Sequence, residues 1–113
     1  MNADNPAADT LELARAALRT VIDPELGYNI VDLGLVYAIE QDAAGGVHVR
    51  MTTTTRGCPA TDYLVQGAQQ ALQQLPGCTG IEVELTYDPP WSPERIGPVA
   101  RLHLGIDRAS AWR

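Results

Sequence analysis

The chain has 113 residues, 45% of them hydrophobic and 19% charged, and its formal net charge is −6. This size and composition fit a single globular domain and exclude a disordered or collagen-like chain. All eight positively charged residues are arginines and they form no cluster, so we expect no binding to nucleic acid or to an anionic membrane. No apolar run approaches the roughly 20 residues that span a bilayer.

The N-terminal residues and the number of cysteines predict where in the cell the protein acts. The N-terminal residues lack the basic and apolar regions of a secretory signal, and two cysteines are too few for a disulfide scaffold. We therefore expect a cytoplasmic protein whose cysteines are thiols. We also expect a flexible N-terminus over residues 1–8, one domain over 9–106 and a C-terminal tail over 107–113.

The first segment predicts an amphipathic helix followed by a turn. Apolar residues recur at helical spacing on one face over residues 11–22, with Asp9 or Thr10 as the cap. The helix should end before Pro24, because a residue that precedes proline avoids the α conformation. Residues 23–27 (DPELG) are then expected to form a tight turn.

The next segment predicts a β-hairpin. Strands are expected over residues 34–41 and 47–53, joined by a loop over residues 42–46. The odd-numbered positions of the second strand should face the core, since apolar residues alternate along it. This alternation points His48 toward solvent.

A second helix is predicted after the segment 56–59, which reads Arg-Gly-Cys-Pro. Pro59 suits the first helical position, which makes Cys58 the N-cap or its neighbour. An apolar stripe follows at helical spacing over residues 64–75, and the Pro-Gly pair at 76–77 ends the helix.

The C-terminal third predicts a strand, an irregular loop and a short helix. Residues 81–85 alternate apolar and polar side chains, and a helix between two strands implies a parallel crossover. The proline-rich segment 88–93 cannot be regular structure. A helix should begin near Pro98, with an edge strand over 99–105 as the alternative. The residues expected to face the core there are Ile96, Val99, and Leu102 or His103.

The predicted order is therefore helix, strand, strand, helix, strand, helix. This order is typical of an α/β protein of the α+β type, a two-layer sandwich with a small mixed sheet.

Judged on the residues alone, Cys58 is the strongest candidate for chemistry. A thiol at a helix N-terminus has a lowered pKa, because the dipole and the unpaired N–H groups stabilise the thiolate, and Arg56 adds to this. The alternative is a cysteine that only caps the helix and packs as a small hydrophobe. Cys78 is expected to be buried. No C-x-x-C spacing occurs, which excludes a zinc knuckle or a dithiol redox site.

Acidic and hydroxyl residues could share a pocket with Cys58. Asp23 and Glu25 lie two positions apart in the turn, and both carboxylates could face one pocket. Alternatively, Asp23 caps the turn and Glu25 only favours its N-terminal dipole. The four threonines at 52–55 place hydroxyls on both faces of a strand, and those nearest Cys58 could line the pocket.

The remaining candidates have simpler interpretations. Neither His48 nor His103 stands at a metal-ligand spacing. Trp91 either packs the proline-rich loop onto the domain or anchors a partner protein.

Five ordered sequence blocks carry a family resemblance. They are DPEL (23–26), IVDLGLVY (30–37), MTTTTRGCP (51–59), GCTGIEVEL (77–85) and DPPWSPER (88–95). Together they closely resemble the iron–sulfur cluster assembly and maturation family typified by SufT and PaaD, and the resemblance covers about residues 10–105.

The resemblance implies a compact α/β domain without enzymatic activity and with one functional pocket. The family's reactive cysteine corresponds to Cys58, its acidic turn to Asp23 and Glu25, and its threonines to Thr54 and Thr55. PaaD-type members carry a C-terminal cysteine-rich tail that this sequence does not show. We therefore expect a short, single-domain member.

Cluster chemistry restricts the expected function further. Iron–sulfur clusters usually have four thiolate ligands, so we expect no stably bound cofactor and at most a transient cluster, with Cys58 as a ligand shared between chains. The expected partners are iron–sulfur assembly proteins and apo-target proteins, and a homodimer is expected.

The sequence thus predicts a non-catalytic factor that assembles iron–sulfur clusters or delivers them to apo-proteins through Cys58. One alternative is an accessory subunit of an aromatic-ring or phenylacetyl-CoA oxygenase system, with Trp91 on the docking surface. A less favoured alternative is a small thiol enzyme, for which His48 is the only candidate base.

Overall fold

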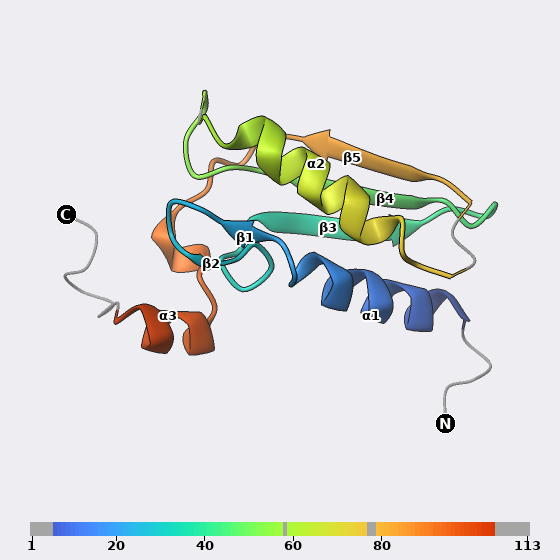
Figure 1. The fold of residues 1–113 in the computed structure, drawn as a ribbon, viewed down its shortest axis with the longest axis horizontal. Helices are drawn as coiled ribbons and strands as arrows, with labels where there is room; N and C mark the ends of the chain where they lie inside the picture. Colours follow the sequence, from blue (N-terminus) through green and yellow to red (C-terminus); the bar gives the residue numbers. More distant parts are fainter. Residues whose placement is uncertain (1–5, 58, 77–78, 106–113) are drawn as a thin grey trace.

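The computed structural model describes residues 6–57, 59–76 and 79–105, and it confirms the predicted α+β architecture with a small mixed sheet (Figure 1). Cys58, Cys78, the predicted C-terminal tail and most of the predicted flexible N-terminus lie outside the described residues. In chain order the elements are α1 (Pro6–Leu18), β1 (Ile22–Asp23), β2 (Tyr28–Asn29), β3 (Val36–Gln41), β4 (Val47–Met51), α2 (Thr61–Leu72), β5 (Ile81–Leu85), the 3₁₀ helix η1 (Pro93–Arg95) and α3 (Pro98–Leu104).

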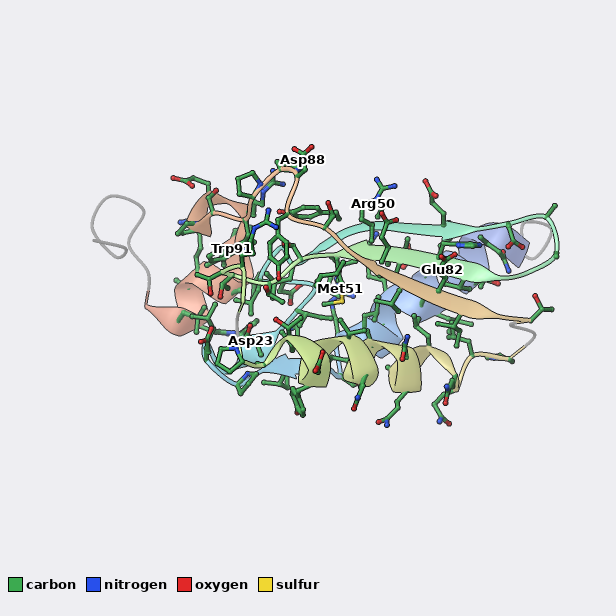
Figure 2. All side chains as sticks on the ribbon, turned by 90° about the horizontal axis from the view of Figure 1, so that it is seen from above. Asp23, Arg50, Met51, Glu82, Asp88 and Trp91 are labelled. Atoms are coloured by element: carbon green, nitrogen blue, oxygen red, sulfur yellow. The ribbon has the colours of Figure 1, made fainter. Side chains whose placement is uncertain are left out.

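One three-stranded sheet in the order β3-β4-β5 organises the domain. The predicted hairpin pairs β3 with β4 antiparallel, and the predicted crossover through α2 places β5 parallel to β4. Helix α1 contacts β3, α2 contacts β5, and the two helices contact each other, so both cover the same face of the sheet (Figures 1 and 2). None of the described helices is long and apolar enough to cross a membrane.

The core lies between this face of the sheet and the helices. The alternation predicted for β4 is confirmed, because its odd-numbered residues are buried while Arg50 lies on the opposite side, as Figure 2 shows for Met51 and Arg50. The predicted stripe of α2 is also buried at Leu64, Ala68 and Leu72. The buried apolar residues of the core are Ala14, Leu18, Val21, Ile30, Leu33, Leu35, Val47, Val49, Met51, Leu64, Ala68, Leu72, Ile96 and Ala100.

The N-terminal helix differs from the prediction at both ends. It begins at Pro6, so Asp9 and Thr10 lie inside the helix and neither is its cap. It ends at Leu18, and the chain then enters β1, whose Ile22 pairs with Asn29 of β2. Ile22 therefore leaves the helical face on which it was expected, and its side chain is 42% exposed.

Helix α2 begins two residues later than predicted. Its N-cap is Ala60, and the first helical hydrogen bond runs from Leu64 N to Ala60 O at 2.9 Å. Pro59 forms part of the preceding turn instead of occupying the first helical position. The N-cap is therefore Ala60, and Cys58 lies outside the described residues.

The C-terminal helix α3 is confirmed, and the alternative of an edge strand is wrong. Of the residues expected to face the core, Ile96 is buried, whereas Val99 and Leu102 are 60% and 80% exposed and Ala100 is the buried residue of the helix. Two hydrogen bonds join this helix to the segment that precedes it. The guanidinium of Arg101 donates from Nε to Ile96 O at 3.0 Å and from Nη2 to Pro93 O at 2.9 Å.

The segment that contains η1 approaches the turn before β3 very closely. Gly97 N donates to Asp32 O at 2.8 Å, and the indole Nε1 of Trp91 donates to Leu33 O at 2.8 Å. Gly34 has a φ of +78°, and a Cβ at this position would overlap the backbone carbonyl of Arg95. Gly34 thus permits both a left-handed backbone and a backbone-to-backbone contact.

We predict that Gly34→Ala lowers the free energy of unfolding by about 2–4 kcal/mol, because strain at positive φ adds to overlap with Arg95. Gly27→Ala is the matched control. Gly27 has a φ of +69° but nothing within 4 Å of a Cβ, so only the conformational cost of about 1 kcal/mol applies. Urea unfolding of both variants measures the difference, and equal losses would contradict the close approach.

Candidate functional site

The acidic turn between β1 and β2 is built around the side chain of Asp23. This side chain is fully buried, and its Oδ1 accepts hydrogen bonds from Glu25 N at 2.7 Å and from Leu26 N at 3.2 Å. Gly27 N donates to the carbonyl oxygen of Asp23 at 2.7 Å and closes the turn. Asp23 thus caps the turn, as the structural alternative proposed, and sets the position of Glu25.

The second carboxylate oxygen of Asp23 does not take part in the hydrogen bonds of the turn. Oδ2 is buried and accepts no hydrogen bond from any residue that the structure describes. A buried polar atom without a partner costs about 1–3 kcal/mol, and more when it is charged. A hydrogen-bond donor supplied at this atom would therefore be unusually stabilising.

The threonine segment after β4 meets the acidic turn. Thr54 Oγ1 donates to Glu25 Oε1 at 3.2 Å. Thr53 is buried, and its Oγ1 donates to Thr55 O at 2.8 Å while lying 2.7 Å from the hydroxyl of Tyr87. These contacts connect the turn, the threonines and the segment after β5.

A groove of about 440 Å³ lies where these segments meet. The labels of Asp23 and Trp91 in Figure 2 mark this end of the molecule. The wall carries one carboxylate and several hydroxyls beside apolar surface. The lining residues are Glu25, Leu26, Thr54, Thr55, Trp91, Ser92 and Pro93.

The structure brings together three of the five predicted pocket residues, namely Glu25, Thr54 and Thr55. Asp23 acts through the turn and does not line the groove, and Cys58 lies outside the described residues. No group of three or more side chains suited to hold a metal ion occurs among the residues that the structure describes.

Sequence reasoning missed the contribution of the proline-rich loop to this groove. The hydrogen bond from Trp91 to Leu33 fixes the loop against the domain, and Ser92 and Pro93 then complete the wall. The proline content predicted an irregular loop but not the place where it packs. Leu26 follows Glu25 in the turn, so its position beside the acidic residue was implicit in the DPEL block.

A second polar cluster lies on the open face of the sheet. His48 contacts Asp42 Oδ2 through Nε2 and Glu82 Oε1 through Nδ1, both at 2.9 Å. The hydrogen bond to Asp42, followed by that to Glu82, raises the pKa of His48 above its ordinary value, and the bond to His48 lowers the pKa of Asp42. His48 points away from the core-facing side of β4, as predicted.

Known proteins are similar to this chain in sequence. The family model described as iron–sulfur cluster assembly protein matches residues 12–85. The chain is 42% identical over 90 residues to the Fe-S protein maturation auxiliary factor YitW of Bacillus subtilis (strain 168), covering 80% of this chain and 88% of YitW. It is 38% identical over 86 residues to the auxiliary factor SufT of Staphylococcus aureus (strain USA300), covering 76% and 98%.

A solved structure shares the fold. It is a domain of unknown function, DUF59, from Bacillus anthracis, with a TM-score of 0.84 and 38% identity, covering 90% of this chain and 97% of that one.

Two longer proteins match in part. An iron–sulfur cluster carrier protein of Mycobacterium tuberculosis (strain ATCC 25618 / H37Rv) is 38% identical over 71 residues, which is 19% of its length. A protein of Escherichia coli (strain K12) named as a component of a putative 1,2-phenylacetyl-CoA epoxidase is 37% identical over 90 residues, 53% of its length.

We predict that the titration midpoint of His48, followed through its ring protons by NMR, lies above 6.5, the ordinary value for histidine. Its stabilising contribution is fully present below the ordinary pKa and is lost as the pH rises through the raised pKa. Asp42→Asn should lower the midpoint. Glu84→Gln, which removes the neighbouring pair with Arg50, is the control and should leave it unchanged. An unchanged midpoint in Asp42→Asn would contradict the assignment.

Proposed function

We propose that this chain, which belongs to the iron–sulfur cluster assembly protein family, is a non-catalytic factor that delivers clusters to apo-proteins through Cys58. Family membership confirms the resemblance inferred from the five sequence blocks. The names of YitW and SufT as maturation auxiliary factors support a role in the maturation of iron–sulfur proteins. The proposed place of action is the cytoplasm.

The observation that carries the proposal is the hydrogen bond from Thr54 to Glu25 at the groove. This bond ties the acidic turn to the segment that continues to Cys58, four positions after Thr54 in the sequence. The groove therefore supplies hydroxyls and a carboxylate at the segment that precedes Cys58 in the sequence. We propose that Cys58, Glu25, Thr54 and Thr55 act as one site, with Asp23 holding the turn in place.

The number of thiols supports a transient handover rather than a resident cluster. A cluster usually takes four thiolates, and the chain has two cysteines. One chain alone cannot complete the coordination shell. A second copy supplies a second Cys58 thiolate, and glutathione, an oxygen ligand or a partner protein supplies the remaining ligands. We therefore propose a homodimer that shares its cargo through Cys58, and apo-target proteins as its clients.

A role as an accessory subunit of an oxygenase is the second candidate. The similarity to the E. coli epoxidase component favours it, although this chain spans about half of that protein's length. Trp91 gives it little support, because the indole is half-buried against the core and bound to Leu33. Copurification of an oxygenase that survives Cys58→Ala would favour this candidate over the first.

A thiol enzyme has the weakest support. Such enzymes usually activate the cysteine with a nearby histidine. His48 is held between Asp42 and Glu82, and the Nδ1 of His103 lies 2.7 Å from the Tyr28 hydroxyl. Neither histidine is among the described residues that line the groove.

We predict that anaerobic reconstitution with iron, sulfide and glutathione gives wild-type protein a visible cluster absorption and roughly half a cluster per chain, as expected for one cluster shared by two chains. Cys58→Ser should lose both the absorption and the bound iron and sulfide. Cys78→Ser is the matched control and should keep them.

Retention of the cluster by Cys58→Ser would contradict the assignment of this residue as a ligand. A wild-type protein that takes up no cluster would exclude the carrier mechanism and leave an adaptor that works through protein contacts.

A further inference from the structure

We infer that Tyr87 is a positioning residue that holds in place the segment from Thr53 to Arg56, and with it the Arg56 guanidinium, which precedes Cys58 by two residues in the sequence. This inference rests on the proposed role of Cys58. Tyr87 reaches this segment through two separate groups, its hydroxyl and its ring, and the sheet fixes the place from which it does so.

The sheet fixes the backbone next to Tyr87. Thr86 N donates to Met51 O at 2.9 Å, which continues the pairing of β4 with β5 by one residue beyond the last strand position. Tyr87 follows directly, and its side chain is half-buried. Its position is therefore set by the most regular part of the fold.

The hydroxyl of Tyr87 completes the hydrogen bonds of Thr53. The two oxygens lie 2.7 Å apart, and the Thr53 hydroxyl also donates to Thr55 O at 2.8 Å. A threonine hydroxyl has one hydrogen, so Tyr87 is the donor in their shared bond. This chain of two bonds fixes the backbone of Thr55, which precedes Arg56.

The ring of Tyr87 holds the side chain of Arg56. The guanidinium carbon lies 4.7 Å from the ring centroid, within the range of a cation–π contact. None of the carboxylates that the structure describes forms an ion pair with Arg56. The guanidinium is therefore held on the ring, and no carboxylate of the described residues neutralises its positive charge.

The consequence for function is electrostatic. Arg56 stands two positions before Cys58 in the sequence, and a nearby guanidinium stabilises a thiolate relative to the thiol. A guanidinium already held on an aromatic ring loses less conformational entropy when it stabilises a thiolate than a guanidinium on a mobile side chain does. Tyr87 thus contributes to the reactivity of Cys58 by positioning Arg56.

The chain contains a matched control for this arrangement. Tyr37 likewise carries a stacked arginine, Arg95 at 4.8 Å, and its hydroxyl donates to a backbone carbonyl, that of Pro89, at 2.8 Å. This second pair lies outside the threonine segment. Substitution of Tyr37 should therefore remove a comparable set of contacts from the fold, as substitution of Tyr87 does, without changing the reactivity of Cys58.

The test is the rate of alkylation of Cys58 by iodoacetamide as a function of pH, in the Cys78→Ser background and without iron or sulfide. We expect Tyr87→Leu and Arg56→Gln each to slow alkylation at pH 7 by about two- to fivefold and to raise the apparent pKa of the thiol. Tyr87→Phe keeps the stacked ring and should retain most of the rate. Tyr37→Leu should match the background protein.

An unchanged pH profile in a folded Tyr87→Leu variant or in Arg56→Gln would overturn the inference, as would an equal effect of Tyr37→Leu. If Tyr87→Leu fails to fold by circular dichroism, Arg56→Gln decides the question, because its side chain is exposed. The assay uses protein without a cluster, so its outcome is independent of the reconstitution that tests the proposed function.

Discussion

Asp23 places a carboxylate inside the protein at the end of β1, and the candidate site is arranged around it. Its Oδ1 accepts the backbone N–H groups of Glu25 and Leu26, and hydrogen bonds to a charged acceptor contribute about 1.5–3 kcal/mol each. These bonds fix the turn that presents Glu25 to Thr54. Its Oδ2 has no hydrogen-bond partner among the residues that the structure describes, so this oxygen can still accept a hydrogen bond.

The groove exists because distant parts of the chain meet at this turn. The threonine segment arrives from β4, and the proline-rich loop arrives from β5 and is locked by the bond between Trp91 and Leu33. Gly34 allows the backbone at Arg95 to approach closely enough to seat that loop. The groove is therefore built from three loops: the turn that joins β1 and β2 of the two-stranded sheet, and the segments that follow β4 and β5 of the three-stranded sheet.

The regular elements were predictable where apolar periodicity determines them, as the alternation through Met51 in β4 shows. Proline marked the start of α3 at Pro98 correctly but not that of α2, because Pro59 lies in the turn before Ala60. The buried face of α3 was mispredicted because large apolar residues are not always the buried ones, and Ala100 packs where Leu102 was expected. The contact of Thr53 with Tyr87 spans 34 positions and leaves no local pattern.

The most direct test of the account is a double-mutant cycle on Glu25→Ala and Thr54→Val. The measured quantity is the rate at which reconstituted protein transfers its cluster to a purified apo-ferredoxin. If the acidic turn and the threonine segment act as one site, each variant slows transfer and the double variant is no slower than the worse single one. The account would be contradicted if the fold-decreases in transfer rate of the two single variants multiply in the double variant. It would also be contradicted if every variant transfers the cluster at the wild-type rate.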